Sequence, residues 1–245
     1  MLAPSQRPRC ECLPKATKHS SELTRPCCRS SQTIYSQGVG PVMPGVFMTP
    51  FPFWHSMGLS RDTPEDELVK AAVYQLELVL QQQTAPTDTA AIFVEPLLGE
   101  GGYIPTPHAY LKALRAICDK HEIMLVIDEV QSGYGRTGKF WCAEHSGVEG
   151  DIVVFAKGLA NGFPLSGIAA SKHVMGSMPP GSLGGTYAGN VVSCAAANAV
   201  LDVVRPSSLS VSPAALMLSL SSPSSSSRRT SSATSPPGPT RCSRT

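Results

Sequence analysis

The sequence predicts an α/β fold in which a mainly parallel sheet has helices on both faces. Three runs of strand length, residues 90–94, 123–127 and 152–155, contain only apolar residues. Continuous apolar runs are typical of strands that are buried on both faces of a parallel sheet. The segments between these runs carry apolar residues at helical spacing. Strands that alternate with helices along the chain are typical of the α/β class.

The first helix is expected to begin at Thr63 and Pro64, ahead of the first strand. A hydroxyl N-cap followed by proline at the first helical position is a common helix start. Glu65 and Asp66 then suit the positive end of the helix dipole. The apolar face of this helix consists of Leu68, Ala72, Leu76 and Leu80.

A second helix is expected between the first two strands, where Thr106 and Pro107 repeat the predicted cap. Its apolar stripe consists of Leu111, Leu114 and Cys118. These elements form a strand, helix, strand unit. The third apolar run adds another strand, and residues 167–170 predict a weaker fourth one.

The two ends of the chain differ from its middle. Residues 1–31 contain four prolines and no helical or strand period, and residues 205–245 contain no acidic residue and many Ser, Pro and Arg. Such compositions are typical of disorder. We therefore expect disordered or unrelated segments at 1–31 and 205–245, and one folded region at 32–204.

Composition excludes several classes of partner. Twenty basic and 18 acidic residues give a net charge of +2, which does not indicate binding to nucleic acid or to an anionic membrane surface. No run reaches the roughly 18 apolar residues that span a bilayer, and the first residues form no apolar signal region. We expect a soluble protein of the cytoplasm or the mitochondrion, although Glu11 and Glu22 count against a mitochondrial presequence.

No metal site is expected. The eight cysteines are scattered, and the four near the start, Cys10, Cys12, Cys27 and Cys28, lack the pair spacing of tetrahedral zinc sites. The histidines show no metal-ligand spacing on one helix. The glycine-rich segment 158–167 also lacks the Gly-Lys-Ser/Thr ending of a phosphate-binding loop, which argues against nucleotide binding.

Glu95, Asp128 and Lys157 follow the three apolar strands, at the sheet edge where ligands bind in folds of this kind. A carboxylate that leaves a buried strand needs a cationic or hydrogen-bonding partner. An amine in an apolar setting loses its proton more readily and can form a Schiff base with a carbonyl. Taken singly, Asp128 could instead cap the next turn and Lys157 could be an exposed lysine at the sheet edge.

Taken together, these two groups fit the needs of one cofactor, pyridoxal phosphate (PLP). A lysine holds the PLP aldehyde, and a carboxylate keeps the pyridine nitrogen protonated. Convergence of the Lys157 amine and the Asp128 carboxylate at neighbouring strand ends is therefore the main structural expectation.

Four sequence segments carry a resemblance to a known family. The segments are FVEPLLGEGG, LVIDEVQSGYGRTG, DIVVFAKGLANGFPLSG and GSLGGTYAGN, in this order. Between about residues 32 and 204 the chain resembles the class III, or omega, aminotransferases, and among them the 4-aminobutyrate, acetylornithine and ornithine aminotransferases. The resemblance implies the central part of the large domain of PLP fold type I.

The resemblance also implies roles for individual residues. Lys157 matches the catalytic Schiff-base lysine, which also shuttles a proton, and Asp128 matches the carboxylate that binds the pyridine nitrogen. Gln131 matches a side chain that binds the phenolic oxygen of the cofactor, and Val130 matches an apolar contact to its ring. Thr186 matches a threonine that reaches the cofactor phosphate of a neighbouring subunit, which implies a homodimer.

The reaction that the resemblance implies moves an amino group from an amine or ω-amino acid to a 2-oxo acid. Glu100 matches a glutamate that gates the binding of the second substrate. Cofactor motifs do not fix which bond is cleaved, so an aminomutase or a decarboxylase on the same scaffold is an alternative.

The chain departs from the family at both ends. Relatives carry a phosphate-binding loop before the matched part and a substrate-binding arginine after it, and neither is found in residues 1–31 or 205–245. We therefore expect a chain truncated at both ends, and an inactive or non-enzymatic fragment is the second alternative.

Overall fold

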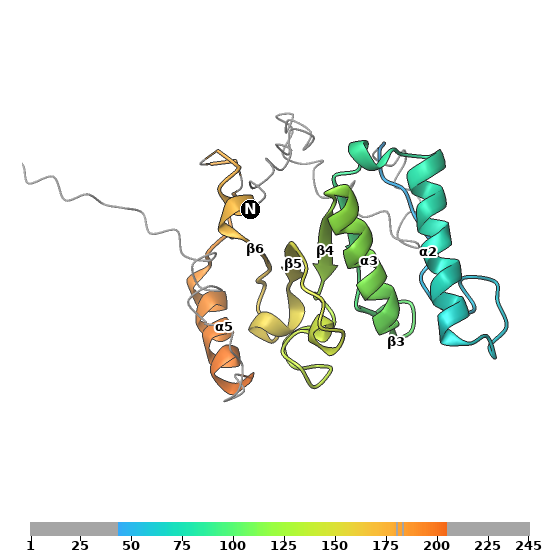
Figure 1. Cartoon of the computed structure of the whole chain (residues 1–245). Helices are drawn as coiled ribbons and strands as arrows, with labels where there is room; N and C mark the ends of the chain where they lie inside the picture. Colours follow the sequence, from blue (N-terminus) through green and yellow to red (C-terminus); the bar gives the residue numbers. More distant parts are fainter. Residues whose placement is uncertain (1–43, 180, 183, 205–245) are drawn as a thin grey trace, which may run out of the picture.

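The computed structural model describes residues 44–179, 181–182 and 184–204 (Figure 1). The two segments expected to be disordered, 1–31 and 205–245, lie outside these residues. Within the described part, helices pack against a central sheet, and the predicted α/β class is confirmed.

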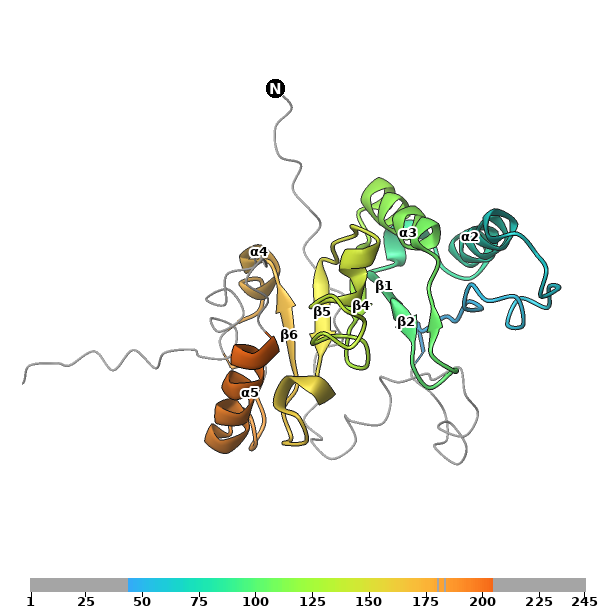
Figure 2. The same ribbon diagram turned by 90° about the horizontal axis from the view of Figure 1, so that it is seen from below.

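The central sheet has four strands in the order β1-β4-β5-β6 (Figure 2). These are β1 (Ala91–Val94), β4 (Met124–Asp128), β5 (Ile152–Phe155) and β6 (Gly167–Ala170). The first three are parallel, and β6 is antiparallel to β5. All four predicted strands are present, and the mainly parallel character of the sheet is confirmed.

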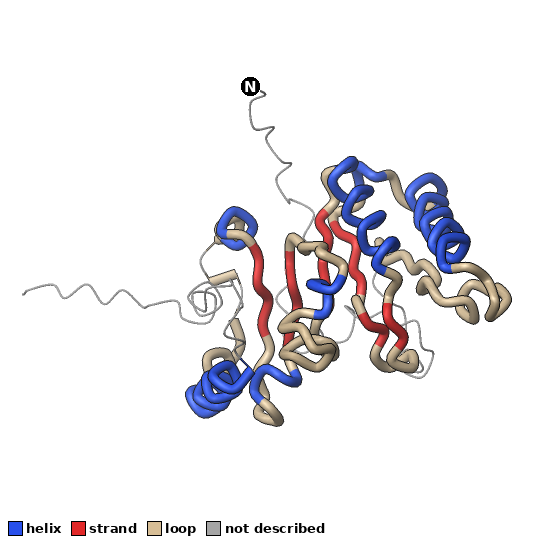
Figure 3. Tube along the Cα trace, turned by 60° about the horizontal axis from the view of Figure 1, so that its bottom comes forward, coloured by secondary structure: helices blue, strands red, loops and turns tan. Residues whose placement is uncertain are grey.

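Helix α3 packs on β4 and α2 packs on α3 at one side of the molecule, whereas α5 lies against η3 at the other side (Figure 3). The α-helices are α2 (Glu65–Gln82), α3 (His108–His121), α4 (Lys172–Met175) and α5 (Val191–Val204). Short 3₁₀ turns are η1 (Pro86–Asp88), η2 (Cys142–His145) and η3 (Lys157–Ala160), and a small antiparallel pair consists of β2 (Leu97–Leu98) and β3 (Ile104–Pro105). None of the helices in the described ranges combines the length and the apolar character that a membrane crossing requires.

The caps predicted for Thr63 and Thr106 are wrong. Both α2 and α3 begin one residue after the proline expected to be their first residue, and no side chain caps either helix. The buried Thr106 hydroxyl instead donates to the Glu95 carbonyl oxygen at 2.7 Å. The hydroxyl is used in this way because the β3–α3 connection passes the end of β1, where a strand carbonyl needs a donor.

The hydrophobic clusters draw their strand side chains from one face of the sheet, which we call the helix face. Its members are Ile92, Val94, Leu125, Ile127, Val153, Phe155 and Ala169. Because side chains alternate along a strand, the opposite face carries Phe93, Val126, Asp128 and Val154, and we call it the Asp128 face. Val126 is buried there, but Phe93 is 71% exposed. The expectation that strand 90–94 is buried on both faces is wrong, because β1 is an edge strand.

The start of β5 is clamped to β4 by a side chain. Asp151 donates its backbone N–H to the Leu125 carbonyl oxygen at 2.8 Å, and its Oδ2 accepts the Leu125 N–H at 2.8 Å. Arg115 of α3 donates to the same Oδ2 at 2.9 Å and pairs with Asp119 at 2.8 Å. The clamp therefore fixes the helix and the two strands in one register.

Candidate active site

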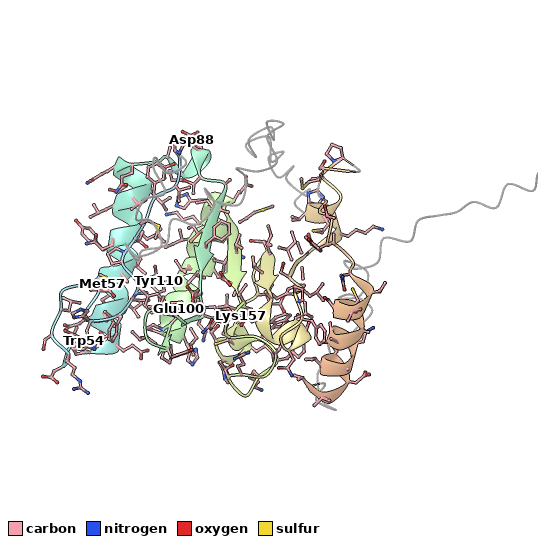
Figure 4. All side chains as sticks on the ribbon, turned by 180° about the vertical axis from the view of Figure 1, so that it is seen from behind. Trp54, Met57, Asp88, Glu100, Tyr110 and Lys157 are labelled. Carbon is pink, nitrogen blue, oxygen red and sulfur yellow. The ribbon has the colours of Figure 1, made fainter. Side chains whose placement is uncertain are left out.

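The carboxyl ends of β1, β4 and β5 meet at one edge of the sheet because these strands are parallel. The residues at these ends are Glu95, Asp128 and Lys157, as the sequence predicted. Figure 4 shows Lys157 and Glu100 at this same edge. The edge therefore collects one amine and several carboxylates in the place where folds of this kind bind ligands.

The pKa of Glu95 shows which charged groups lie near this edge. Burial raises the pKa of its carboxyl above the usual value, although the hydrogen bond from the Gly99 N–H at 2.9 Å opposes that shift. The negative charges of Asp128 and Glu100 raise this pKa further, and the positive charge of Lys157 lowers it. All of these groups therefore lie within electrostatic reach of Glu95.

Asp128 is the last residue of β4 and is half-buried. Its Oδ1 accepts the Val130 N–H at 2.9 Å, so one carboxylate oxygen caps the turn after the strand. Within the described part of the chain, no hydrogen bond reaches Oδ2. Asp128 therefore serves the turn with one oxygen and can offer the other to a ligand.

Lys157 begins the turn η3, two residues after β5 ends. Its backbone has φ of 36°, in the left-handed region that residues other than glycine seldom occupy. Its side chain is exposed, so the apolar setting that the sequence predicted for the amine is wrong. The amine donates instead to the side-chain oxygen Oε1 of Gln131. The sharp turn after β5 thus directs the lysine toward the segment that follows β4.

Gln131 is held between two partners. Its Oε1 accepts from Lys157, and its Nε2 donates to the Tyr103 hydroxyl at 3.2 Å. The side chain also passes close to the backbone of Gly99, where a Cβ would lie 2.8 Å from the Gln131 Cγ. Only glycine leaves room for the glutamine in this position.

Glu129 is a fully buried acid that the sequence reasoning did not single out. Its carboxylate accepts the Ser132 hydroxyl at 2.5 Å and the Ala143 N–H at 2.8 Å. Burial raises the pKa of this carboxyl, and the two hydrogen bonds oppose the shift. The period of two along the strand could have found it, because the residue after Asp128 must point to the helix face. Glu129 ties the segment that carries Gln131 to the turn η2.

The structure does not bring every expected residue to this edge. Val130 is half-buried, and its backbone N–H donates to the Asp128 carboxylate. Thr186 is exposed in the segment before α5, and no hydrogen bond or ion pair among the described residues links it to Lys157. Tyr103 does reach the edge, although a single aromatic residue in a glycine-rich loop gives no signal of this in the sequence.

The side chains at this edge are those that a pyridine aldehyde needs. Lys157 provides a primary amine, Asp128 a carboxylate oxygen, and Gln131 an amide within hydrogen-bonding reach of the amine. Their chemistry fits PLP. Within residues 44–179, 181–182 and 184–204, no three His, Cys, Asp or Glu side chains are grouped to hold a metal ion.

Fold and site together define an α/β protein with an exposed primary amine near carboxylates at the sheet edge. A family model described as "Aminotransferase class-III" matches residues 26–222, a longer stretch than the one that carries the four motifs. The chain belongs to the class-III aminotransferase family.

The chain is similar to two aminotransferases over most of its own length. It is 43% identical over 175 residues to 5-aminovalerate aminotransferase DavT of Pseudomonas putida. It is 44% identical over 176 residues to 4-aminobutyrate aminotransferase GabT of Escherichia coli. Each match covers 71% of this chain and 39% of the relative, so the chain spans about two fifths of the length of these relatives.

A solved structure also matches. The amine transaminase of an uncultivated Pseudomonas species, in its PLP-bound form, superposes with a TM-score of 0.62 at 31% identity. The match covers 71% of this chain and 40% of that structure. The fold of the matched part is thus the fold of a transaminase.

Proposed function

We propose that this chain is the PLP-binding part of an aminotransferase that moves an amino group from an amine or ω-amino acid to a 2-oxo acid. The observation that carries the proposal is the Lys157 amine, hydrogen-bonded to Gln131 at the strand ends where Asp128 also lies. The names of the two relatives and of the PLP-bound structure support the same assignment.

Each side chain at the edge has a defined part in this proposal. When bound, PLP supplies an electrophilic aldehyde and a ring that accepts electrons. The Lys157 amine would hold the aldehyde end of the cofactor, with loss of one water, and would carry a proton to or from the substrate carbon. The Asp128 carboxylate would keep the pyridine nitrogen protonated. Gln131 would donate its amide N–H to the phenolic oxygen, and Val130 would provide an apolar contact to the ring.

The proposed amino donors are ω-amino acids of the size of 4-aminobutyrate and 5-aminovalerate, because the two similar relatives are named for these compounds. Such donors carry a carboxylate at the end opposite their amine. Glu100 is exposed at the same edge as Lys157 and is proposed to gate the acidic second substrate (Figure 4). A negative side chain in this position disfavours a second carboxylate until it moves aside.

The proposed active form is a homodimer in which Thr186 of one subunit reaches the cofactor phosphate of the other. Its support is that Thr186 is exposed and separate from the Lys157 edge of its own chain. Titration of the wild type and of Thr186→Val with PLP, followed by absorbance, tests this role, and sedimentation velocity of both proteins reports whether the dimer is retained. A variant that binds PLP as tightly as the wild type would contradict it.

The decisive experiment traps PLP on its lysine. Purified chain is incubated with PLP and reduced with borohydride, and peptide masses then locate the added cofactor. We expect the adduct on Lys157 and its loss in Lys157→Ala. Lys172→Ala is the matched control, because Lys172 is also exposed but lies on α4. No adduct on Lys157 at any PLP concentration would favour the inactive or non-enzymatic fragment.

Product analysis separates transamination from the other reactions of this scaffold. The protein is incubated with PLP, 5-aminovalerate or 4-aminobutyrate, and a 2-oxo acid. Transfer of nitrogen to the 2-oxo acid supports the proposal. Release of carbon dioxide would indicate a decarboxylase, and movement of the amino group within one molecule would indicate an aminomutase.

A further inference from the structure

We propose that Tyr103 is a positioning residue that anchors the amide of Gln131 so that its oxygen meets the Lys157 amine. The inference rests on the proposed function, since Gln131 and Lys157 belong to the proposed PLP site. Tyr103 itself touches neither Lys157 nor a reacting atom in this role. It acts through the glutamine.

The backbone around Tyr103 is held in a tight turn between β2 and β3. The N–H groups of Gly102 and Tyr103 both donate to the Gly99 carbonyl oxygen at 3.1 Å. Tyr103 has φ of 57°, a left-handed conformation that a bulky residue adopts only where its surroundings impose it. The turn thus fixes the direction in which the phenol leaves the loop, and the hydroxyl reaches Gln131, 28 residues further along the chain.

The donors and acceptors of Lys157, Gln131 and Tyr103 determine which way the Gln131 amide faces. A lysine ammonium has only donors, so the end of the amide that faces it must be the oxygen. The NH₂ end of Gln131 then faces Tyr103, whose phenol oxygen accepts at 3.2 Å. Removal of the hydroxyl leaves the amide held at one end only and free to rotate about its last torsion.

The anchor matters because Gln131 has little other support. Glycine at position 99 makes room for its side chain but provides no polar contact to the amide. Both hydrogen bonds of the amide are exposed to water, which competes for them. The tyrosine hydroxyl is therefore the protein group that keeps the amide facing the amine.

The test measures the reactivity of Lys157 in the protein without PLP. The full chain is treated with a trace of acetic anhydride, and mass spectrometry compares acetylation of Lys157 with that of Lys172 in the same sample. We expect Tyr103→Phe to raise this ratio by about two- to fivefold, the range that loss of one exposed hydrogen bond allows. Tyr74→Phe is the control, because Tyr74 is an exposed tyrosine of α2 and should leave the ratio unchanged.

A double-mutant cycle tests whether Tyr103 acts through the glutamine. Gln131→Ala should raise the ratio at least as much as Tyr103→Phe, and the double variant should match Gln131→Ala alone. A ratio in Tyr103→Phe equal to that of the wild type would overturn the proposal. Additive effects in the double variant would do the same, because they would make Tyr103 an independent shield of Lys157.

Two further measurements keep the outcomes distinct. Equal melting temperatures of the Tyr103→Phe and wild-type chains exclude a general loosening of the fold, whereas a shared change at Lys157 and Lys172 would count against the anchor. The labelling requires no cofactor. Failure to trap PLP would therefore contradict the proposed function but would leave the labelling result valid. An unchanged labelling ratio would contradict the proposed role of Tyr103 but not the proposed function.

Discussion

The two faces of the sheet differ, because the helix face packs into the core whereas the Asp128 face is partly exposed and carries a site residue. On the helix face, side chains such as Leu125 and Ile127 are 0% and 1% exposed and join the clusters that include α2 and α3. On the Asp128 face, Phe93 remains 71% exposed, and the face ends in a carboxylate at the site edge. The difference follows from the alternation of side chains along each strand.

This contrast indicates where stability and chemistry are encoded. A residue on the helix face loses packing on all sides when it is shortened, whereas an exposed residue on the Asp128 face has little packing to lose. Neighbouring acids show the same division, since Glu129 is buried against Ser132 and Ala143 while Asp128 faces the edge with Lys157. Substitutions on the two faces should therefore have separable effects.

The largest effect is expected from truncation in the core below the helix face. Leu125→Ala should lower the free energy of unfolding by about 2–5 kcal/mol, because a side chain of β4 that is 0% exposed leaves a cavity on the helix face. Phe93→Ala, its counterpart on the Asp128 face, should change stability by about 0.5 kcal/mol or less. Urea denaturation of both variants checks this. Equal losses in the two would contradict the contrast between the faces.

A smaller loss of stability is expected at Thr106, beside the carboxyl end of β1. Thr106→Val should cost about 1–3 kcal/mol, because it leaves the Glu95 carbonyl oxygen without its buried donor. Thr63→Val should be nearly neutral, since no side chain caps α2. Thermal melts of the two variants compare these positions. A matching loss in Thr63→Val would restore the helix cap that the sequence predicted.

The smallest effect is expected from Glu129→Gln, which preserves the shape of the side chain. Because burial raises the pKa of Glu129, the folded chain holds this proton more tightly than the unfolded chain does. Stability from this group is therefore present below the unfolded pKa and is lost as pH rises through the folded pKa, by about 1.4 kcal/mol for each unit of difference. Urea denaturation from about pH 4 to pH 7 should show Glu129→Gln gaining on the wild type as pH rises. A gain toward acid pH would mean that the buried carboxylate is the favoured form.

The strands could be predicted because their signal is local. Apolar runs such as the one in β4 specify a buried strand without reference to the rest of the chain, and parallel neighbours then place Asp128 and Lys157 at one edge. The direction of β6 could not be predicted, because a four-residue run carries no information about the strand it joins. Phe93 was expected to be buried for a similar reason, since the edge position of β1 is a property of the whole sheet.

The site could be predicted only in part. The strand-end residues follow from the fold, but the setting of Lys157 depends on the turn after β5, which exposes the side chain. Tyr103 and Gln131 are far apart in the sequence and meet only because the loop between β2 and β3 lies beside the segment that follows β4. Contacts of this kind depend on loop geometry that no residue pattern encodes.

The bond pair between Leu125 and Asp151 also bears on how the chain finds its pairing as it folds. A slip of β5 by one residue along β4 would turn Val154 toward the helix face and would separate the Asp151 carboxylate from both Leu125 and Arg115. A mispaired sheet would therefore lose one of the two ion pairs of Arg115, which keeps its partner Asp119 on the same helix, and would expose apolar side chains of β5. The Asp151 carboxylate at one end of the strands therefore favours the single alignment that places Asp128 and Lys157 together at the other end.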